Sequence, residues 1–280
     1  MPIYDGNGNP IEISSAIAVT DPDRFVDNEG MARTGTLEYS NYRFYPKVYT
    51  DQIERKVKMY DGGVLLALGD SYTAMAGTEF NTFAQNHGLV CDNLGYGSST
   101  IAGTTDGTVG YHPFWSRLDA EIASFPKTIN GTTYNLSDVK LITFMGGAND
   151  WTAQTEEVDR IGDSTSTDKA QLWGATKYIF DKFQTTFPNA DVIVILQPSN
   201  ASSESSNYWM WKKEGIVKEC ADMYSLPVCD CRFEWYNPVN PSDAAAYWQS
   251  DNLHLNTAGK AKLFEKLENA LNSLQFYRAN

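Results

Sequence analysis

From residue 61 onward, short apolar segments of strand length alternate with segments of helical pattern, and this alternation constrains the fold more than any other feature. Near-continuous apolar strands joined by helical crossovers are typical of a parallel sheet that is buried on both faces. The sequence therefore predicts an α/β fold, and any functional site should be assembled from the residues that follow the strands, at their carboxyl ends. The apolar segments are 64–68, 89–94, 139–145, 192–196 and 226–229, and the helical segments are 79–86, 114–124, 169–187, 208–224 and 257–274.

Residues 1–60 differ from the rest of the chain, because they are rich in Asp, Asn, Gly and Tyr and contain only two short periodic patches, 11–19 and 43–48. We interpret them as an irregular N-terminal appendage, followed by one domain over residues 61–280. The appendage is a candidate contact to a second copy of the chain or to an assembly such as a phage tail or cell-surface structure. The first residues have neither the basic nor the apolar region of a secretory signal. We therefore expect a cytoplasmic protein, a component of a phage particle, or a secreted protein whose leader has been removed.

Charge and composition exclude several classes of protein. The formal net charge of −13 repels phosphate backbones and anionic lipid surfaces, so nucleic acid is not an expected partner. No apolar run approaches the roughly 18 residues that cross a bilayer, so we expect no membrane partner either. The four cysteines and three histidines have no zinc-ligand spacing, and we expect neither a metal nor another cofactor.

The tripeptide Gly69-Asp70-Ser71 follows the first apolar segment, where the first strand is expected to end. Glycine allows the backbone to turn sharply, and a serine at the start of a helix exposes its hydroxyl beside helix amides, as a nucleophile requires. The alternative is an ordinary N-cap, in which Asp70 or Ser71 only holds the first helical turn.

Two further loops follow the second and third apolar segments. Residues 93–100 (NLGYGSST) are mostly small and can aim backbone N–H groups at a ligand, although a flexible Gly/Ser loop has the same composition. Residues 146–150 (GGAND) include Asn149, whose side chain can donate a hydrogen bond to a developing oxyanion. Gly, Asn and Asp are also common turn formers, so a simple turn is the alternative for this segment.

Asp251 and His254 stand three residues apart, directly before the last helical segment. On one turn, the carboxylate can hold one imidazole nitrogen and leave the other free to act as a base. A structural pair that caps the last helix is the alternative. All four segments follow apolar segments or precede the last helical segment, where a parallel sheet would bring them together. They supply a nucleophile, two hydrogen-bond donors for an oxyanion, and a base whose imidazole is held by a carboxylate. This complete set of roles favours catalysis.

These motifs resemble those of the SGNH, or GDSL-type, esterase and lipase superfamily. The first block corresponds to Gly69-Asp70-Ser71, the third to Gly147-Ala148-Asn149-Asp150 and the fifth to Asp251-Asn252-Leu253-His254. The resemblance implies a three-layer α/β/α flavodoxin-like sandwich with a five-stranded parallel sheet. It also implies a catalytic triad of Ser71, His254 and Asp251.

The oxyanion hole that the resemblance implies consists of the Ser71 backbone N–H, a backbone N–H of the second block and the Asn149 side chain. Counted from Asn93, the usual glycine of the second block falls at Ser98, whereas Gly97 lies one position earlier. Either residue can be the donor, because only a backbone N–H is required.

Together these features predict a serine esterase. An α/β-hydrolase would need Gly-x-Ser-x-Gly, which the chain lacks, and flavin binding would leave the Asp251/His254 pair without a role. The expected loops around the site are polar and aromatic, which favours removal of a small acyl group, above all acetyl, from a carbohydrate. The expected substrate contacts are Asp70, Trp151, Trp235, Tyr247 and Trp248. The alternatives are a lipase or thioesterase for longer acyl chains, or a binding or structural component of a larger assembly with an incidental hydrolase fold.

Overall fold

The computed structural model describes residues 17–19, 25–26, 35–37, 45–46, 60, 62–150, 160–199, 204–232 and 246–278. The chain divides into two compact units, Met1–Met59 and Tyr60–Asn280. In the first unit, β1 (Ile17–Val19) pairs with β3 (Gly35–Leu37), and β2 (Phe25–Val26) pairs with β4 (Tyr45–Pro46). Both pairs are antiparallel. The proposed contact role of the first 60 residues stays a prediction.

The second unit contains a five-stranded parallel sheet with the strand order β11-β10-β9-β5-β6. Its strands are β5 (Gly63–Gly69), β6 (Leu89–Gly95), β9 (Val139–Met145), β10 (Asp191–Leu196) and β11 (Val228–Asp230). The parallel sheet expected from the apolar segments is thus confirmed. The last strand begins two residues later than expected. Pro227 lacks an N–H and contributes only its carbonyl oxygen, which accepts a hydrogen bond from Val194 at 2.9 Å.

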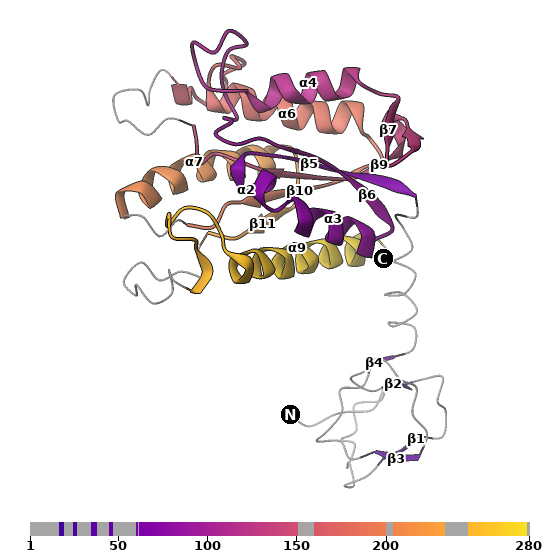
Figure 1. The fold of residues 1–280 in the computed structure, drawn as a ribbon. Helices are drawn as coiled ribbons and strands as arrows, with labels where there is room; N and C mark the ends of the chain where they lie inside the picture. Colours follow the sequence, from indigo (N-terminus) through magenta and orange to yellow (C-terminus); the bar gives the residue numbers. More distant parts are fainter. Residues whose placement is uncertain are drawn as a thin grey trace. The chain divides into compact units, whose positions relative to one another are not determined.

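Helices cover both faces of this sheet. Figure 1 shows α4 (Phe114–Ala123) and α6 (Leu172–Thr186) on one side of the sheet, and α3 (Gly77–Asn86) and α9 (Thr257–Arg278) on the opposite side. The helix α7 (Glu204–Met223) shares the core of α4 and α6, and the short helix α2 (Ser71–Met75) shares the core of α3 and α9. The predicted three-layer α/β/α sandwich is therefore confirmed.

Alternate residues of β5 point into the two cores, because successive side chains of a strand face opposite sides. Val64, Leu66 and Leu68 belong to the core beneath α4, α6 and α7. Leu65 and Ala67 belong to the core beneath α3 and α9. Burying a leucine side chain completely stabilises a fold by about 1.5–3 kcal/mol, so both faces of the strand must be apolar. The polar residues begin only where β5 ends, at the carboxyl edge of the sheet.

A small antiparallel hairpin, β7 (Lys127–Ile129) and β8 (Thr132–Tyr134), precedes the 3₁₀ helix η3 (Leu136–Asp138) and is not among the expected elements. Its two turn residues, Asn130 and Gly131, have φ values of 48° and 83°, as a type I′ turn requires. Among the helices of the described residues, none is both long enough and apolar enough to cross a membrane.

Candidate active site

Ser71 is the first residue of α2 and lies just after the central strand β5, which ends at Gly69. A Cβ atom at Gly69 would lie only 1.9 Å from the Oγ1 atom of Thr73, so a larger residue does not fit at this turn. Asp70 is the N-cap of α2, because its Oδ1 atom accepts a hydrogen bond from the Tyr72 N–H at 3.0 Å. The capping role therefore belongs to Asp70, which leaves the Ser71 hydroxyl available for another partner.

A chain of hydrogen bonds joins Ser71 to His254, which lies 183 positions later in the sequence. The Oγ atom of Ser71 lies 2.9 Å from Nε2 of His254, and Nδ1 of His254 lies 2.7 Å from Oδ2 of Asp251. The other oxygen of Asp251 accepts hydrogen bonds from the N–H groups of Leu253 and His254, each at 3.0 Å. The imidazole thus stands between the carboxylate and the serine hydroxyl, as the sequence predicted.

The segment that carries the carboxylate–histidine pair is an irregular loop before α9 rather than a helical turn. Asn252 within it has a φ of 55°, which lies in the left-handed region. The N–H of Gln249 donates to the His254 carbonyl oxygen at 2.7 Å. The Tyr72 hydroxyl donates to the Leu253 carbonyl oxygen at 2.5 Å. This last bond ties the histidine loop directly to α2, the helix that begins with the serine.

Asp251 keeps its negative charge at all but strongly acidic pH. The hydrogen bond to His254, together with the two backbone N–H groups, lowers the pKa of Asp251 to about 2. An ionised carboxylate at Nδ1 favours the tautomer that carries its proton on Nδ1 and leaves Nε2 free as an acceptor. The electrostatics therefore suit His254 for the removal of a proton from the Ser71 hydroxyl.

Beneath the serine, Asp70 is fully buried and joins a second hydrogen-bond chain. Its Oδ2 atom accepts a hydrogen bond from Nε2 of Gln197 at 2.8 Å, and Oε1 of Gln197 accepts one from the Ala148 N–H at 2.9 Å. Burial raises the pKa of Asp70 to about 6, although the Gln197 bond opposes this shift. Gln197 therefore links the serine turn to the loop that carries Asn149. Sequence analysis missed Gln197, although its place directly after the fourth strand is the signal that identifies it.

The loop after β9 is tied to the loop after β6. The Nδ2 atom of Asn149 donates to the Ser99 carbonyl oxygen at 3.0 Å. The carboxylate of Asp150 accepts hydrogen bonds from the N–H groups of Ile101 and Ala102, each at 2.9 Å. Burial raises the pKa of Asp150 to about 6. These contacts bring the second and third motif segments together at the carboxyl edge of the sheet, next to Ser71.

The family of this chain follows from its sequence as a whole. Residues 67–262, more than half of the chain, match the model of the GDSL-like Lipase/Acylhydrolase family. The chain belongs to this family. This match confirms the family that the three sequence motifs suggested. None of the curated proteins matches this GDSL-like chain.

Several solved structures share the fold of this GDSL-like protein. A protein from Lactobacillus plantarum is 22% identical, with a TM-score of 0.59, over 76% of this chain and 98% of its own. A possible lipase from Chitinophaga pinensis is 13% identical, with a TM-score of 0.50, over 76% of this chain and 98% of its own. An acetyl xylan esterase from Geobacillus stearothermophilus is 16% identical, with a TM-score of 0.49, over 76% of this chain and 97% of its own. At these identities the likeness to the first two structures shows the fold alone.

The second motif segment departs from the usual GDSL pattern at Gly97 and Ser98. Both residues are exposed in the turn after β6. Ser98 has a φ of 61°, in the left-handed region that favours glycine, whereas Gly97 does not have a positive φ. The backbone conformation therefore agrees with the count from Asn93, which matches Ser98 to the usual glycine of the family.

The expected substrate contacts of this GDSL-like hydrolase need correction. Trp151 and Trp235 lie outside the described residues. Asp70 is fully buried, and both of its carboxylate oxygens accept hydrogen bonds within the protein. Trp248 is only 3% exposed and packs in the core beneath α9. Asp70 and Trp248 are therefore not substrate contacts, because buried side chains do not reach a ligand; the first supports the serine turn and the second belongs to the core.

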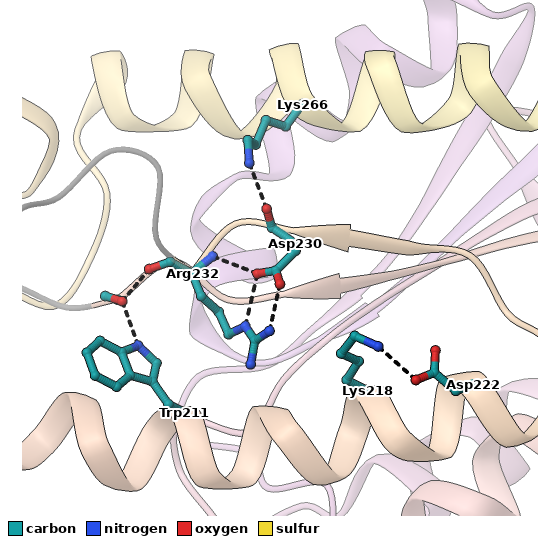
Figure 2. Close-up of polar contacts among 7 residues, drawn as sticks. Trp211, Lys218, Asp222, Asp230, Arg232 and Lys266 are labelled. Atoms are coloured by element: carbon teal, nitrogen blue, oxygen red, sulfur yellow. Dashed lines mark hydrogen bonds and ion pairs between the residues drawn. The ribbon is translucent and has the colours of Figure 1, made fainter.

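Tyr247, the remaining expected contact, is half-buried and lines a cavity of about 860 Å³ between β11 and α9. Figure 2 shows the polar contacts at the end of β11: Arg232 binds the Asp230 carboxylate through Nε and Nη2, at 2.9 and 2.6 Å. Lys266 of α9 donates to the Asp230 carbonyl oxygen at 2.7 Å. None of the candidate triad residues, all of which are described, lines this cavity. The site is therefore identified by its hydrogen-bond chain and not by cavity size.

Proposed function

We propose that this protein is a serine carboxylic ester hydrolase in which Ser71 is the nucleophile, His254 the general base and acid, and Asp251 the group that orients the imidazole. The observation that carries the proposal is the chain of hydrogen bonds from Ser71 through His254 to Asp251, at 2.9 and 2.7 Å. A nucleophile, a base and an orienting carboxylate within such reach are typical of an activated serine. Membership of the GDSL-like family supports ester hydrolysis as the reaction.

The proposed reaction has two halves with the same proton carrier. Ser71 Oγ attacks the ester carbonyl carbon while Nε2 of His254 takes the hydroxyl proton, and the same proton then leaves with the alcohol. Water attacks the acyl-serine in the second half, again giving its proton to His254, and the carboxylic acid and free serine result. Asp251 holds the proton on Nδ1 throughout and stabilises the imidazolium.

The oxyanion of each tetrahedral intermediate needs preorganised donors. We assign this role to the backbone N–H of Ser71, to the backbone N–H of Gly97 or Ser98, and to the Asn149 side chain. The φ of Ser98 supports Ser98 over Gly97. The Asn149 amide has two N–H bonds, and its bond to Ser99 uses one and holds the group in place, which leaves the second for the oxyanion.

The decisive test is the Ser71→Ala variant with p-nitrophenyl acetate as substrate. We expect kcat/KM to fall by at least about 10³-fold, because the nucleophile is lost. A fluorophosphonate probe should label the unmodified protein at Ser71 and should not label the variant. The exposed Ser273 on α9 offers a matched control, since Ser273→Ala should retain both turnover and labelling. Near-full turnover by Ser71→Ala would exclude this mechanism.

We also propose that the acyl group is short, above all acetyl, and that the alcohol is a carbohydrate. The composition of the segments that follow the strands supports both parts: 100–115, 151–168 and 233–248 are polar and aromatic and contain few Leu, Ile or Val residues, so they do not supply a broad aliphatic channel for a long acyl chain. A series of p-nitrophenyl esters from acetate to palmitate tests acyl length, and acetate release from acetylated xylan, pectin and sialic acid tests the alcohol. A preference for chains of eight or more carbons would favour the lipase or thioesterase alternative.

A second proposal concerns residues 1–60, which we suggest attach the hydrolase domain to another copy of the chain or to a larger assembly. It is supported by the separation of Met1–Met59 as a compact unit of its own. Light scattering on the full chain over a range of concentrations tests self-association. If the chain self-associates, we expect a molar mass of at least twice the 31.2 kDa of one chain. A monomer at all concentrations would exclude the homo-oligomer.

A further inference from the structure

Three aromatic side chains form an exposed group beside the candidate active site, which we call the Tyr96 cluster: Tyr96, Tyr111 and His112. Tyr96 is 44% exposed, Tyr111 is 50% exposed, and His112 is also exposed. The ring centroid of His112 lies 4.5 Å from that of Tyr96 and 4.1 Å from that of Tyr111. The two tyrosine rings lie 6.3 Å apart. Single exposed apolar side chains are common, but a contiguous group of rings next to a catalytic loop indicates a binding surface.

The backbone of Tyr96 is bonded to the residues that border the proposed nucleophile and oxyanion donors. Its N–H donates to the carbonyl oxygen of Gly69, two residues before Ser71, at 3.1 Å. Its carbonyl oxygen accepts a hydrogen bond from Ser99 Oγ at 2.7 Å. The carbonyl oxygen of Ser99 in turn accepts a hydrogen bond from Nδ2 of Asn149. The backbone of Tyr96 is therefore tied by hydrogen bonds to the segments that carry the proposed nucleophile and oxyanion donors.

Tyr111 is held just as firmly at the base of the loop that leads from the second motif segment to α4. The N–H of Thr100 donates to the Tyr111 carbonyl oxygen at 2.9 Å, and the N–H of Tyr111 donates to Thr100 Oγ1 at 3.0 Å. Gly110, with a φ of 70°, lets the two chain segments approach, because a Cβ there would lie 2.3 Å from the Ala102 carbonyl oxygen. These contacts fix the backbone, while about half of the Tyr111 surface stays exposed.

His112 has a φ of 43°, a conformation that costs free energy for any residue other than glycine. Strain of this kind persists mainly where the surrounding structure requires it, and it occurs often at ligand sites. On another side of the cluster, the Arg117 guanidinium lies over the Tyr96 ring at 5.9 Å and donates to the Gly69 carbonyl oxygen at 2.8 Å. The Tyr96 ring is thus supported from within the protein and keeps an exposed surface.

We propose that the Tyr96 cluster is a carbohydrate subsite, on which a neutral pyranose ring of the substrate stacks while its ester lies at Ser71. This inference rests on the proposed function and adds the subsite and the class of sugar. A pyranose has apolar C–H faces and a rim of hydroxyl groups, which match the apolar faces and polar edges of tyrosine and histidine rings. The net charge of −13 disfavours acidic polysaccharides, so we assign a neutral rather than an acidic sugar to this subsite.

The test compares an acetylated neutral oligosaccharide with ethyl acetate, an ester that has no ring to stack. For Tyr111→Ala in the full chain, we expect the ratio of kcat/KM for acetylated xylo-oligosaccharide to kcat/KM for ethyl acetate to fall about 10-fold. Tyr111→Phe should retain the ratio, because it keeps the ring. The matched control is Tyr208→Ala on α7, a tyrosine that is 56% exposed and lies outside the cluster. An unchanged ratio in Tyr111→Ala, with both esters still hydrolysed, would overturn the subsite and leave the proposed function standing.

A binding measurement makes the result independent of turnover. Calorimetric titration of the full chain with xylohexaose, cellohexaose and chitohexaose should detect binding of at least one, with Kd raised about 5-fold or more by Tyr111→Ala. Binding of none of the three, or equal Kd values in both proteins, would overturn the proposal. A loss in Tyr111→Ala that is specific to aryl esters such as p-nitrophenyl acetate would also overturn it, since the cluster would then bind an aromatic leaving group rather than a sugar. If Tyr111→Ala weakens sugar binding but the unmodified protein hydrolyses no ester, the proposed function is refuted and the sugar subsite stands.

Discussion

The serine side and the histidine side of the candidate site differ most in burial. Asp70, next to Ser71, is fully buried and bonded to Gln197, which is also fully buried. Asp251, which holds His254, has 46% of its side chain exposed. Ser71 directly follows β5, a central strand of the sheet. His254 lies in a loop at the surface, directly before α9. The residues that support Ser71 are therefore part of the protein core, whereas the carboxylate that orients His254 lies at the surface.

This difference separates two kinds of effect that a substitution can have. On the histidine side, water can solvate whatever remains after a substitution, so activity should change while the free energy of unfolding stays nearly constant. On the serine side, a lost partner leaves a buried polar group unsatisfied, which costs about 1–3 kcal/mol. Stability and activity should therefore change together there. The following predictions test this separation, in order of decreasing effect.

Asp251→Asn should have the largest effect on activity among variants that leave the serine in place. An asparagine amide at this position favours the imidazole tautomer with its proton on Nε2, which cannot accept the Ser71 proton. We expect kcat to fall by about 10²–10⁴-fold, with little change in the thermal midpoint. The matched control is Asp222→Asn, which removes an exposed carboxylate that binds Lys218 at 2.7 Å on α7 (Figure 2). If Asp251→Asn lost stability but kept its turnover rate, the expected difference between the histidine side and the serine side would be wrong.

Asn149→Ala should lower kcat by about 10²–10³-fold, because one oxyanion donor is removed. The effect on KM should be smaller, since the donor is worth more to the intermediate than to the ground-state ester. Steady-state kinetics with p-nitrophenyl acetate separate the two constants. The exposed Asn269 on α9 provides the control variant Asn269→Ala. Equal losses in binding and turnover would argue against the oxyanion role.

Gln197→Leu should destabilise the fold by about 1–3 kcal/mol, because the buried Asp70 carboxylate and the Ala148 N–H each lose a partner. The same change should lower kcat, since it releases the serine turn from the loop that carries Asn149. Urea unfolding and turnover are measured on the same samples. Gln184→Leu is a matched control, because the Gln184 amide also donates one hydrogen bond, to Tyr224 at 2.7 Å, but on the surface. We expect that control to stay within about 0.5 kcal/mol.

The pH dependence of stability should follow the buried carboxyl groups. Burial raises the pKa of Asp70 and of Asp150 from 3.8 to about 6, so the folded state binds more protons than the unfolded state between these values. The free energy of unfolding should therefore fall as pH rises from about 4 to about 6, on the order of 1–3 kcal/mol for each group. The lowered pKa of Asp251 acts only below about pH 4, where stability is lost as pH falls. Urea titrations at several pH values would contradict this account if stability rose between pH 4 and 6.

Much of the fold could be predicted because its signals are local. The apolar run of β5 indicated burial on both faces, and Val64 and Leu65 indeed point into different cores. The hairpin β7–β8 was missed although its signal is present, since Asn130-Gly131 is the dipeptide that favours a type I′ turn. In the site, the motif residues were found by type and spacing. Gln197 was missed because it belongs to no motif and acts only through Asp70 and Ala148, which lie in the loops after two other strands.

The sequence by itself determined the class of fold, the family and the residue types of the candidate site, because periodicity and motif spacing are written in neighbouring residues. Only the tertiary structure decided that Ser71 and His254 meet at 2.9 Å across 183 positions of chain, and that Asp70 and Trp248 are buried where substrate contacts were expected. It also decided that Tyr96, Tyr111 and His112 gather in solvent beside them. Burial and long-range contact depend on how distant segments pack against each other, and that packing has no signature in any short stretch of sequence.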